Sequence, residues 1–185
     1  MKISVSFVVN FTTESTKYTE PVKFKDMHQL LTTQYELVKG ARQALFSYCE
    51  KIAPDDLFEK IETFNNSCII DLLVHNANTY IGWLQNFGLD ATVPFYESGN
   101  IKNLAQVEQI FEEVDRFVVD FLQKYSDNYQ QKLTKIVGHR GTTATLTPLE
   151  LFTHVITHEF HHKGQILTMS RVLGYIPVDT DVIRT

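Results

Sequence analysis

The segment from Thr147 to Gly174 constrains this chain most, because its sequence predicts one long helix with both ends marked. Thr147 is a good N-cap residue and Pro148 takes the first helical position. Glu150, three residues after the cap, completes a capping box. Gly174 is a C-terminal stop signal, and Pro177 prevents the helix from resuming. The segment therefore predicts a helix with a defined start and end.

Four histidines lie inside this helix: His154, His158, His161 and His162. His158 and His162 are one turn apart, so their Cβ atoms lie roughly 5–6 Å apart and both imidazoles can reach one metal ion. His154 lies one turn earlier on the same stripe, and His161 is rotated off it. Helical histidines are often solvated or structural. Apolar neighbours turn part of this row inward, where each unpaired polar group costs about 1–3 kcal/mol, and a metal would satisfy them.

The run His158–His162 also matches H-E-x-x-H, which in metalloproteases supplies two zinc ligands and a general-base glutamate. The extended form of that motif fails, since Gln165 and Thr168 occupy its glycine and histidine positions. The only carboxylates downstream are Asp179 and Asp181, in what looks like a tail. With little strand to hold an extended peptide, a protease is the weaker hypothesis.

Composition favours an ordinary soluble globular protein. The 185 residues are 43% hydrophobic and 21% charged, which predicts a single domain, residues 1–185. The net charge of -5 argues against a general nucleic-acid binder, and no apolar run is long enough to span a membrane. Cys49 and Cys68 show neither metal spacing nor a disulfide framework, so free thiols in a reducing cytoplasm are expected.

Three more helices are predicted upstream. Asp26 is expected to cap the first, which should stop near Ile52, and the others span about Cys68–Phe87 and Leu104–Tyr125. Residues 127–146 predict a hairpin or an extended crossover loop, and residues 1–22 form an extension that begins with a short strand. On the third helix an acidic solvated face is expected, made of Glu108, Glu112, Glu113 and Asp115. Together these elements predict an all-α four-helix bundle over about residues 26–174, in which metal sites lie between facing helices.

Three segments resemble the DinB-like family, also called DinB/YfiT-like metalloenzymes. They are LTPLELFTHVITHEFHHKGQI, SCIIDLLVHNANTYIGWL and, more weakly, QYELVKGARQALFSYCEKIAPDDLFEK. The resemblance covers about Met27 onward and implies an up-up-down-down four-helix bundle. It also implies one divalent metal, nickel or zinc, held by His75, His158 and His162. Lys163 departs mildly from the family's usual arginine. Without the resemblance, His75 is a mid-helix histidine of the kind that is usually structural.

The same resemblance places His154 and His161 as second-shell or structural residues. Candidate pocket or second-shell residues, each of which can equally be packing, are Asn76, Tyr80, Trp83 and Gln165. Glu159 is a weak candidate for a catalytic base. Its position next to His158 turns it about 100° away on the helix, so we expect it to face solvent or a neighbouring helix.

Three neutral imidazoles with an open position are typical of a catalytic metal site rather than a closed structural one. Such a metal lowers the pKa of bound water toward ~7 or activates a thiol as its thiolate. The resemblance implies a metal-dependent transferase or hydrolase acting on a small molecule, with a low-molecular-weight thiol as cosubstrate, and a homodimer. The alternative is a non-catalytic metal-binding or stress-associated bundle protein.

Overall fold

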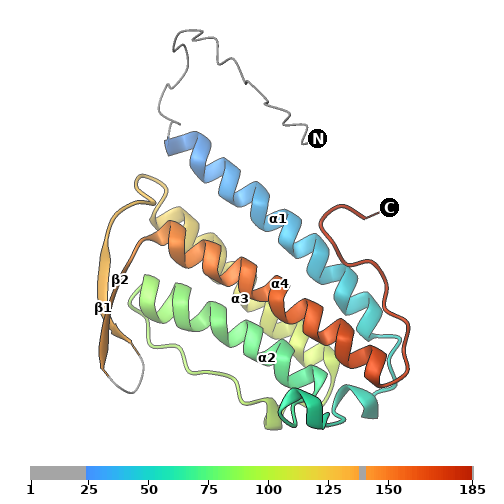
Figure 1. Cartoon of the computed structure of the whole chain (residues 1–185). Helices are drawn as coiled ribbons and strands as arrows, with labels where there is room; N and C mark the ends of the chain where they lie inside the picture. Colours follow the sequence, from blue (N-terminus) through green and yellow to red (C-terminus); the bar gives the residue numbers. More distant parts are fainter. Residues whose placement is uncertain (1–23, 138–140, 185) are drawn as a thin grey trace, which may run out of the picture.

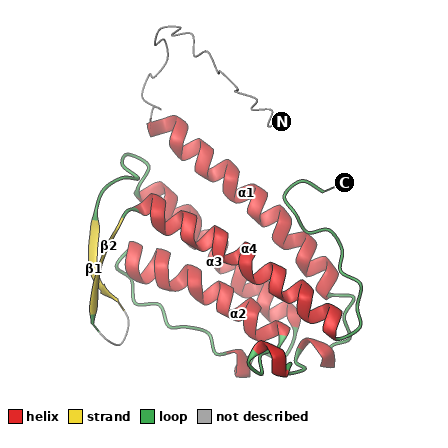
Figure 2. Ribbon diagram, in the orientation of Figure 1, coloured by secondary structure: helices red, strands yellow, loops and turns green. Residues whose placement is uncertain are grey.

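Four long helices make up most of the chain. A computed structural model describes residues 24–137 and 141–184. The helices are α1 (Phe24–Cys49), α2 (Ile69–Tyr80), α3 (Leu104–Lys124) and α4 (Pro148–Val172), shown in Figures 1 and 2. A π-helical segment, Ile81–Gly88, continues α2 directly. The four-helix bundle is confirmed, whereas the extended segment expected in residues 1–22 lies outside the described residues.

The ends of α4 are capped as the sequence predicts. The Thr147 hydroxyl accepts a hydrogen bond from the Glu150 backbone N–H (3.1 Å), and the Glu150 carboxylate accepts one from the Thr147 N–H (2.7 Å). Gly174 follows the helix with a φ of 94°, a left-handed conformation that glycine adopts without strain. These contacts satisfy backbone groups that a helix end otherwise leaves without partners.

Two other helix starts differ from the sequence prediction. The predicted first residue of the second helix, Cys68, is the N-cap of α2, which begins at Ile69, and the Cys68 N–H donates to the Asp71 carboxylate (2.9 Å). Asp26 lies inside α1 and does not cap it, since the helix is already formed at Phe24. Helix ends predicted from caps alone commonly move by a few residues in this way.

The helix directions differ from the up-up-down-down expectation. Contacts between α1 and α4 advance together along both chains, which makes these helices parallel; the pairs are Tyr35–Phe152, Arg42–Glu159 and Tyr48–Ser170. Contacts between α1 and α3 run in opposite order, Arg42–Asp115 and then Phe46–Phe111. Helices α2 and α4 are also antiparallel, with Trp83 against His154 and His75 against His158 and His162. The arrangement is therefore up-down-down-up.

The connections explain this arrangement. Residues 50–68 turn the chain back at the end of α1, whereas residues 89–103 return along the bundle and make α2 and α3 parallel (Figure 1). Between α3 and α4, strands β1 (Leu133–Val137) and β2 (Thr142–Leu146) form an antiparallel hairpin, in which Leu133 pairs with Leu146. This confirms the hairpin alternative. The Leu149 N–H donates to the Tyr129 carbonyl (3.1 Å) and holds both ends of the connection together.

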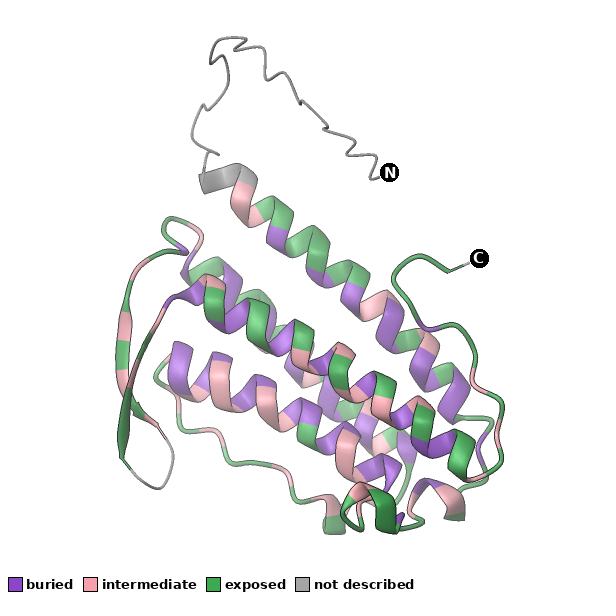
Figure 3. Ribbon diagram, viewed as in Figure 1, coloured by how far each residue is buried: buried purple, intermediate pink, exposed green. Residues whose placement is uncertain are grey.

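The core lies where the four helices face one another, as the buried residues in Figure 3 show. The predicted apolar face of α3 is buried apart from Phe117, which is half-buried. The predicted acidic face is only partly solvated, because Asp115 pairs with Arg42 and Glu113 accepts a hydrogen bond from Tyr96. His28, near the start of α1, is half-buried and forms a hydrogen bond with the Tyr129 hydroxyl (2.7 Å).

Among the residues that the structure describes, no helix combines the length and the apolar character needed to cross a membrane.

Candidate metal centre

Three histidines from two helices meet on one side of the bundle. Because α2 and α4 are antiparallel, His75 from the middle of α2 faces His158 and His162, one turn apart on α4. The ring centroid of His75 lies 5.0 Å from that of His158 and 4.8 Å from that of His162. One ring nitrogen from each residue lies within 4.8 Å of the other two, so the three can hold a metal ion.

The ring geometry fits a tetrahedral metal. The Nε2 atoms of His158 and His162 are 3.3 Å apart. In a tetrahedral zinc site with Zn–N bonds of about 2.0–2.1 Å, two ligand nitrogens lie about 3.3 Å from each other. The residues present therefore suit a divalent ion without a large rearrangement of α4.

Gln165 sets the tautomer of His162. The amide oxygen of Gln165 lies 2.5 Å from His162 Nδ1, and a carbonyl oxygen only accepts, so Nδ1 carries the proton. The lone pair of Nε2 is then free and points toward the other two histidines. Gln165, expected as a pocket or second-shell residue, thus contacts a candidate ligand directly. Nδ1 of His158 has no such partner among the described residues.

All three imidazoles favour the neutral state. Partial desolvation lowers the pKa of His75 below its usual value. Desolvation and then the neighbouring His162 and His75 lower the pKa of His158 to about 4. Desolvation also lowers the pKa of His162, although its bond with Gln165 opposes the shift. Neutral rings near pH 7 are the form that binds a metal.

The other two histidines of α4 stay outside this group. His154 is exposed and packs edge-on against Trp83, with ring centroids 5.3 Å apart. His161 is also exposed and contacts the ring of His162 at 4.8 Å. Neither supplies a fourth nitrogen to the cluster, which contains three residues within the described part of the chain. The described cluster thus offers three ligand nitrogens from two helices.

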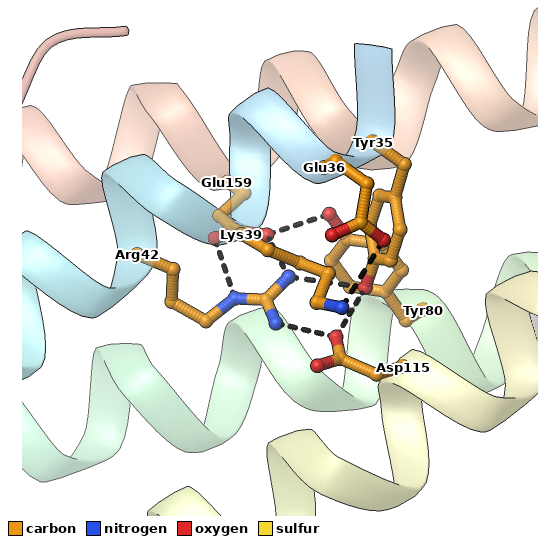
Figure 4. A network of polar contacts seen from close by, with 7 residues as sticks. All are labelled: Tyr35, Glu36, Lys39, Arg42, Tyr80, Asp115 and Glu159. Carbon is orange, nitrogen blue, oxygen red and sulfur yellow. Dashed lines mark hydrogen bonds and ion pairs between the residues drawn. The ribbon is translucent and has the colours of Figure 1, made fainter. Parts of the chain in front are cut away.

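Glu159 points toward Arg42 and Tyr80 inside the bundle, as Figure 4 shows. The residue is 6% exposed, and its carboxylate accepts hydrogen bonds from Arg42 Nε (2.8 Å) and Nη2 (3.0 Å), and from the Tyr80 hydroxyl (2.6 Å). Of the two orientations expected, toward solvent or toward a neighbouring helix, the structure shows the second. A carboxylate held by three donors is poorly placed to accept a substrate proton, so its contacts give the weak catalytic assignment no support.

Arg42 is the centre of this buried network and was missed by sequence reasoning. Besides Glu159, its guanidinium donates to Asp115 (2.7 Å) and to the Tyr35 hydroxyl (3.1 Å), linking three helices. Burial alone would lower the pKa of Arg42, but the charge of Glu159 raises it well above its usual value. The sequence did carry a signal, since Arg42 follows Val38 and Ala41 and precedes Leu45 on the apolar stripe of α1. A cation on such a stripe needs a buried anion.

A pocket of about 720 Å³ opens beside His75, which forms part of its wall. Half of the ten other lining residues are aromatic or aliphatic: Trp83, Phe87, Phe95, Ile136 and Val137. Trp83 is therefore a pocket residue, as the sequence suggested. Tyr80 and Asn76 are not, since both are buried in the core, and Asn76 Oδ1 has no partner among the described residues.

Comparison with known proteins identifies relatives of similar length. An uncharacterized protein of Bacillus subtilis (strain 168), YizA, is 24% identical over 145 residues, which cover 77% of this chain and 87% of the relative. Protein DinB of the same organism is 24% identical over 157 residues, covering 80% of this chain and 88% of its own length. The sequence model of the DinB family matches residues 27–185. The chain therefore belongs to the DinB family.

Proposed function

We propose that this protein is a metal-dependent enzyme in which His75, His158 and His162 hold one divalent ion, zinc or nickel. The observation that carries the proposal is the meeting of three neutral imidazoles, one nitrogen from each within 4.8 Å of the others, of which His75 also lines a pocket. Metal identity does not follow from the ligands, because imidazole suits nickel, copper and zinc alike, and occupancy also depends on geometry and on which metal is available.

The reaction proposed is group transfer to a low-molecular-weight thiol, or hydrolysis, on a small-molecule substrate. A divalent ion supplies Lewis acidity, which favours the deprotonated form of a thiol or of water. The protein contributes the remaining parts. Gln165 holds His162 in one tautomer, and the Arg42–Glu159 pair fixes the turn of α4 that carries His158. The pocket next to His75 positions the substrate and excludes water from the apolar side.

Three ligands favour this hypothesis over a non-catalytic metal-binding bundle. A structural site usually recruits a fourth protein ligand, and the nearest candidates, His154 and His161, are exposed and lie outside the cluster. Cytoplasmic location and homodimer formation stay predictions. Elution of the purified chain as a monomer at micromolar concentration would contradict the dimer.

The test loads the metal-free protein with zinc or with nickel and assays both forms. Glutathione, cysteine and coenzyme A are each offered with 1-chloro-2,4-dinitrobenzene, and loss of free thiol is followed; p-nitrophenyl acetate tests hydrolysis. The His158→Ala/His162→Ala double variant is the control. We expect turnover by a loaded wild-type form that the double variant lacks. Rates equal to the double variant for every pairing, at full metal loading, would contradict the proposed chemistry.

A further inference from the structure

The pocket beside His75 is built from apolar side chains of three separate segments. Trp83 and Phe87 come from the π-helical segment Ile81–Gly88, Phe95 from the returning connection, and Ile136 and Val137 from β1. Phe95 is 60% exposed and Ile136 is 73% exposed, so both present apolar surface to solvent at the pocket. Converging exposed apolar groups around a concave site are typical of a binding site for a small apolar ligand.

The amide side chains in the pocket wall already have partners. Asn78 donates to the Tyr96 carbonyl (2.8 Å) and accepts from the Tyr96 N–H (2.8 Å). Asn86, two turns further on, makes the same pair of bonds with Val93 (2.9 and 2.8 Å). These two amides hold the returning connection against α2 and its continuation, and thereby place Phe95 over the pocket. Each amide uses one N–H and one lone pair of its oxygen in these bonds.

The remaining polar lining is occupied as well. The Thr79 hydroxyl donates to the His75 carbonyl (3.0 Å). The ammonium group of Lys135 lies 2.6 Å from the Asp90 carboxylate, and it also lies 5.9 Å from the centre of the Phe87 ring. The ammonium group of Lys135 therefore already has a counter-ion in Asp90. The described pocket wall is thus mostly apolar, and its polar part consists of His75 and these partnered groups.

Gly82 provides the space beneath Phe95. A Cβ atom at this position would lie 3.4 Å from two atoms of the Phe95 ring, so any longer side chain would enter the pocket. The wider π-helical turn carries four of the lining residues, Gly82, Trp83, Asn86 and Phe87. Insertions of this kind into α-helices occur frequently at functional sites, where they change the direction in which side chains point.

We propose that this pocket binds an aromatic or alkyl group of the substrate, which leaves the substrate's polar reacting end toward His75. The orientation of the reacting end rests on the proposed function, whereas recognition of the apolar group rests on the pocket alone. The substrate class is therefore a small molecule with a substantial hydrocarbon part next to one metal-binding heteroatom. Sugars, free amino acids and other molecules that are polar throughout do not fit this wall.

The test uses n-alkanols from butanol to octanol, added to the metal-free protein and to the zinc-loaded protein. Trp83 is the only tryptophan of the chain and lies in the pocket, so its indole N–H resonance and its fluorescence report binding there. We expect the dissociation constant to fall about threefold to fourfold for each added methylene group. 1,6-Hexanediol, which matches 1-hexanol in length but has two polar ends, should bind at least about tenfold more weakly.

Matched variants locate the binding. Ile136→Ser should weaken 1-octanol binding about tenfold, whereas Ile176→Ser, at an isoleucine 89% exposed and outside the pocket, should leave it unchanged. Gly82→Leu should abolish binding by filling the space below Phe95. Gly82→Leu can also disturb the helix that contains it. If the circular dichroism spectrum of this variant changes, the test is decided by comparing Ile136→Ser with Ile176→Ser.

The outcomes separate this inference from the proposed function. Alkanol binding to the metal-free protein, with no zinc uptake, would sustain the pocket and overturn the metal chemistry. Zinc uptake with no dependence on chain length, or equal affinity for 1-hexanol and 1,6-hexanediol, would overturn the apolar pocket. Tighter binding of hexanoate than of 1-hexanol to the metal-free protein would also overturn it, because Lys135 would then be the recognition group.

Discussion

At the scale of single residues, the hydrogen bond between Gln165 and His162 has the most direct chemical consequence. By accepting a hydrogen bond from the Nδ1–H group, Gln165 favours the tautomer in which Nε2 carries no proton and faces His158 and His75. Partners of this kind orient a metal ligand and raise its basicity, and their removal typically costs 10–100-fold in metal affinity. The contact is local, since both residues lie three positions apart on α4.

Gln165→Ala should therefore weaken zinc affinity about 10–100-fold while the fold is kept. Gln165→Glu retains an acceptor for Nδ1 and should bind zinc at least as well as the wild type. Competition with a chromophoric chelator measures both affinities. Thr168→Ala, one turn further along at an exposed residue, is the matched control and should change nothing. An affinity for Gln165→Ala equal to that of Thr168→Ala would show that the bond does not set the tautomer.

Two of the three candidate ligands could be predicted from the sequence pattern alone, and the third could not. His158 and His162 follow from helical spacing, because residues one turn apart share a face in any helix. His75 lies in another helix, and its pairing with them depends on how the helices pack, so it came from family resemblance. The burial of Glu159 was left open, although Val155, Ile156 and Ile166 on the same face of α4 are apolar and buried and carried the signal.

At the scale of helices, the Arg42 network is the strongest polar link inside the bundle. Arg42 on α1 reaches Glu159 on α4 and Asp115 on α3, and Tyr80 at the end of α2 donates to the same glutamate. All four helices therefore meet at one set of hydrogen bonds (Figure 4). A buried ion pair is not strongly stabilising in itself, yet removing one partner leaves a charge without compensation.

Arg42→Met should lower the free energy of unfolding by about 3–5 kcal/mol, because Glu159 loses its buried counter-charge. Adding Glu159→Leu to this variant should restore part of the loss. Arg116→Met, at an exposed arginine of α3, is the control and should change stability by less than about 0.5 kcal/mol. Urea unfolding followed by circular dichroism measures all of them. A loss below about 1 kcal/mol in Arg42→Met would mean that Glu159 takes up a proton or finds water.

The contact between α3 and the end of the π-helical segment leaves no space for a side chain at position 88. A Cβ atom on Gly88 would lie 2.5 Å from Cε2 of Phe121, whose ring is fully buried. The Tyr125 hydroxyl donates to the Gly88 carbonyl and adds to the close approach. The glycine is therefore required by packing and not by a left-handed backbone.

Gly88→Ala should destabilise the protein by about 1–3 kcal/mol, since the buried Phe121 ring must move to admit one methyl group. Gly99→Ala is the matched control, because nothing lies within 4 Å of the Cβ position there. Thermal unfolding of both variants measures the difference. Equal melting temperatures for the two variants would show that α3 shifts freely and that the close contact does not exclude a methyl group at position 88.

At the scale of the whole molecule, the order of the helices was harder to predict than their existence. Caps and apolar spacing define each helix, but they do not determine whether a connection turns back or crosses the bundle. The 21 residues of α3 rise about 32 Å, and an extended chain covers about 3.3–3.6 Å per residue. Residues 89–103 are thus long enough to cross. The Asn78 and Asn86 contacts that hold them there join residues 18 and 7 positions apart.

The antiparallel arrangement of α2 and α4 is also what brings the metal ligands together. His75 lies opposite His158 and His162, and the same arrangement sets Trp83 beside His154 and the pocket along the outer side of α2. A two-histidine pair on one helix binds metal ions weakly, whereas a third ligand from another helix makes a site that depends on the fold. Whether His75 binds the metal therefore distinguishes a histidine pair on α4 alone from a three-histidine site formed by two helices.

The measurement that tests the account most directly is zinc binding to His75→Ala, beside the wild type and His154→Ala. Isothermal titration of the metal-free proteins gives stoichiometry and affinity, and elemental analysis gives the metal retained after purification. We predict one zinc per chain in the wild type and in His154→Ala, and an affinity at least about 100-fold weaker in His75→Ala. One zinc per chain bound with unchanged affinity by His75→Ala would contradict the three-histidine centre.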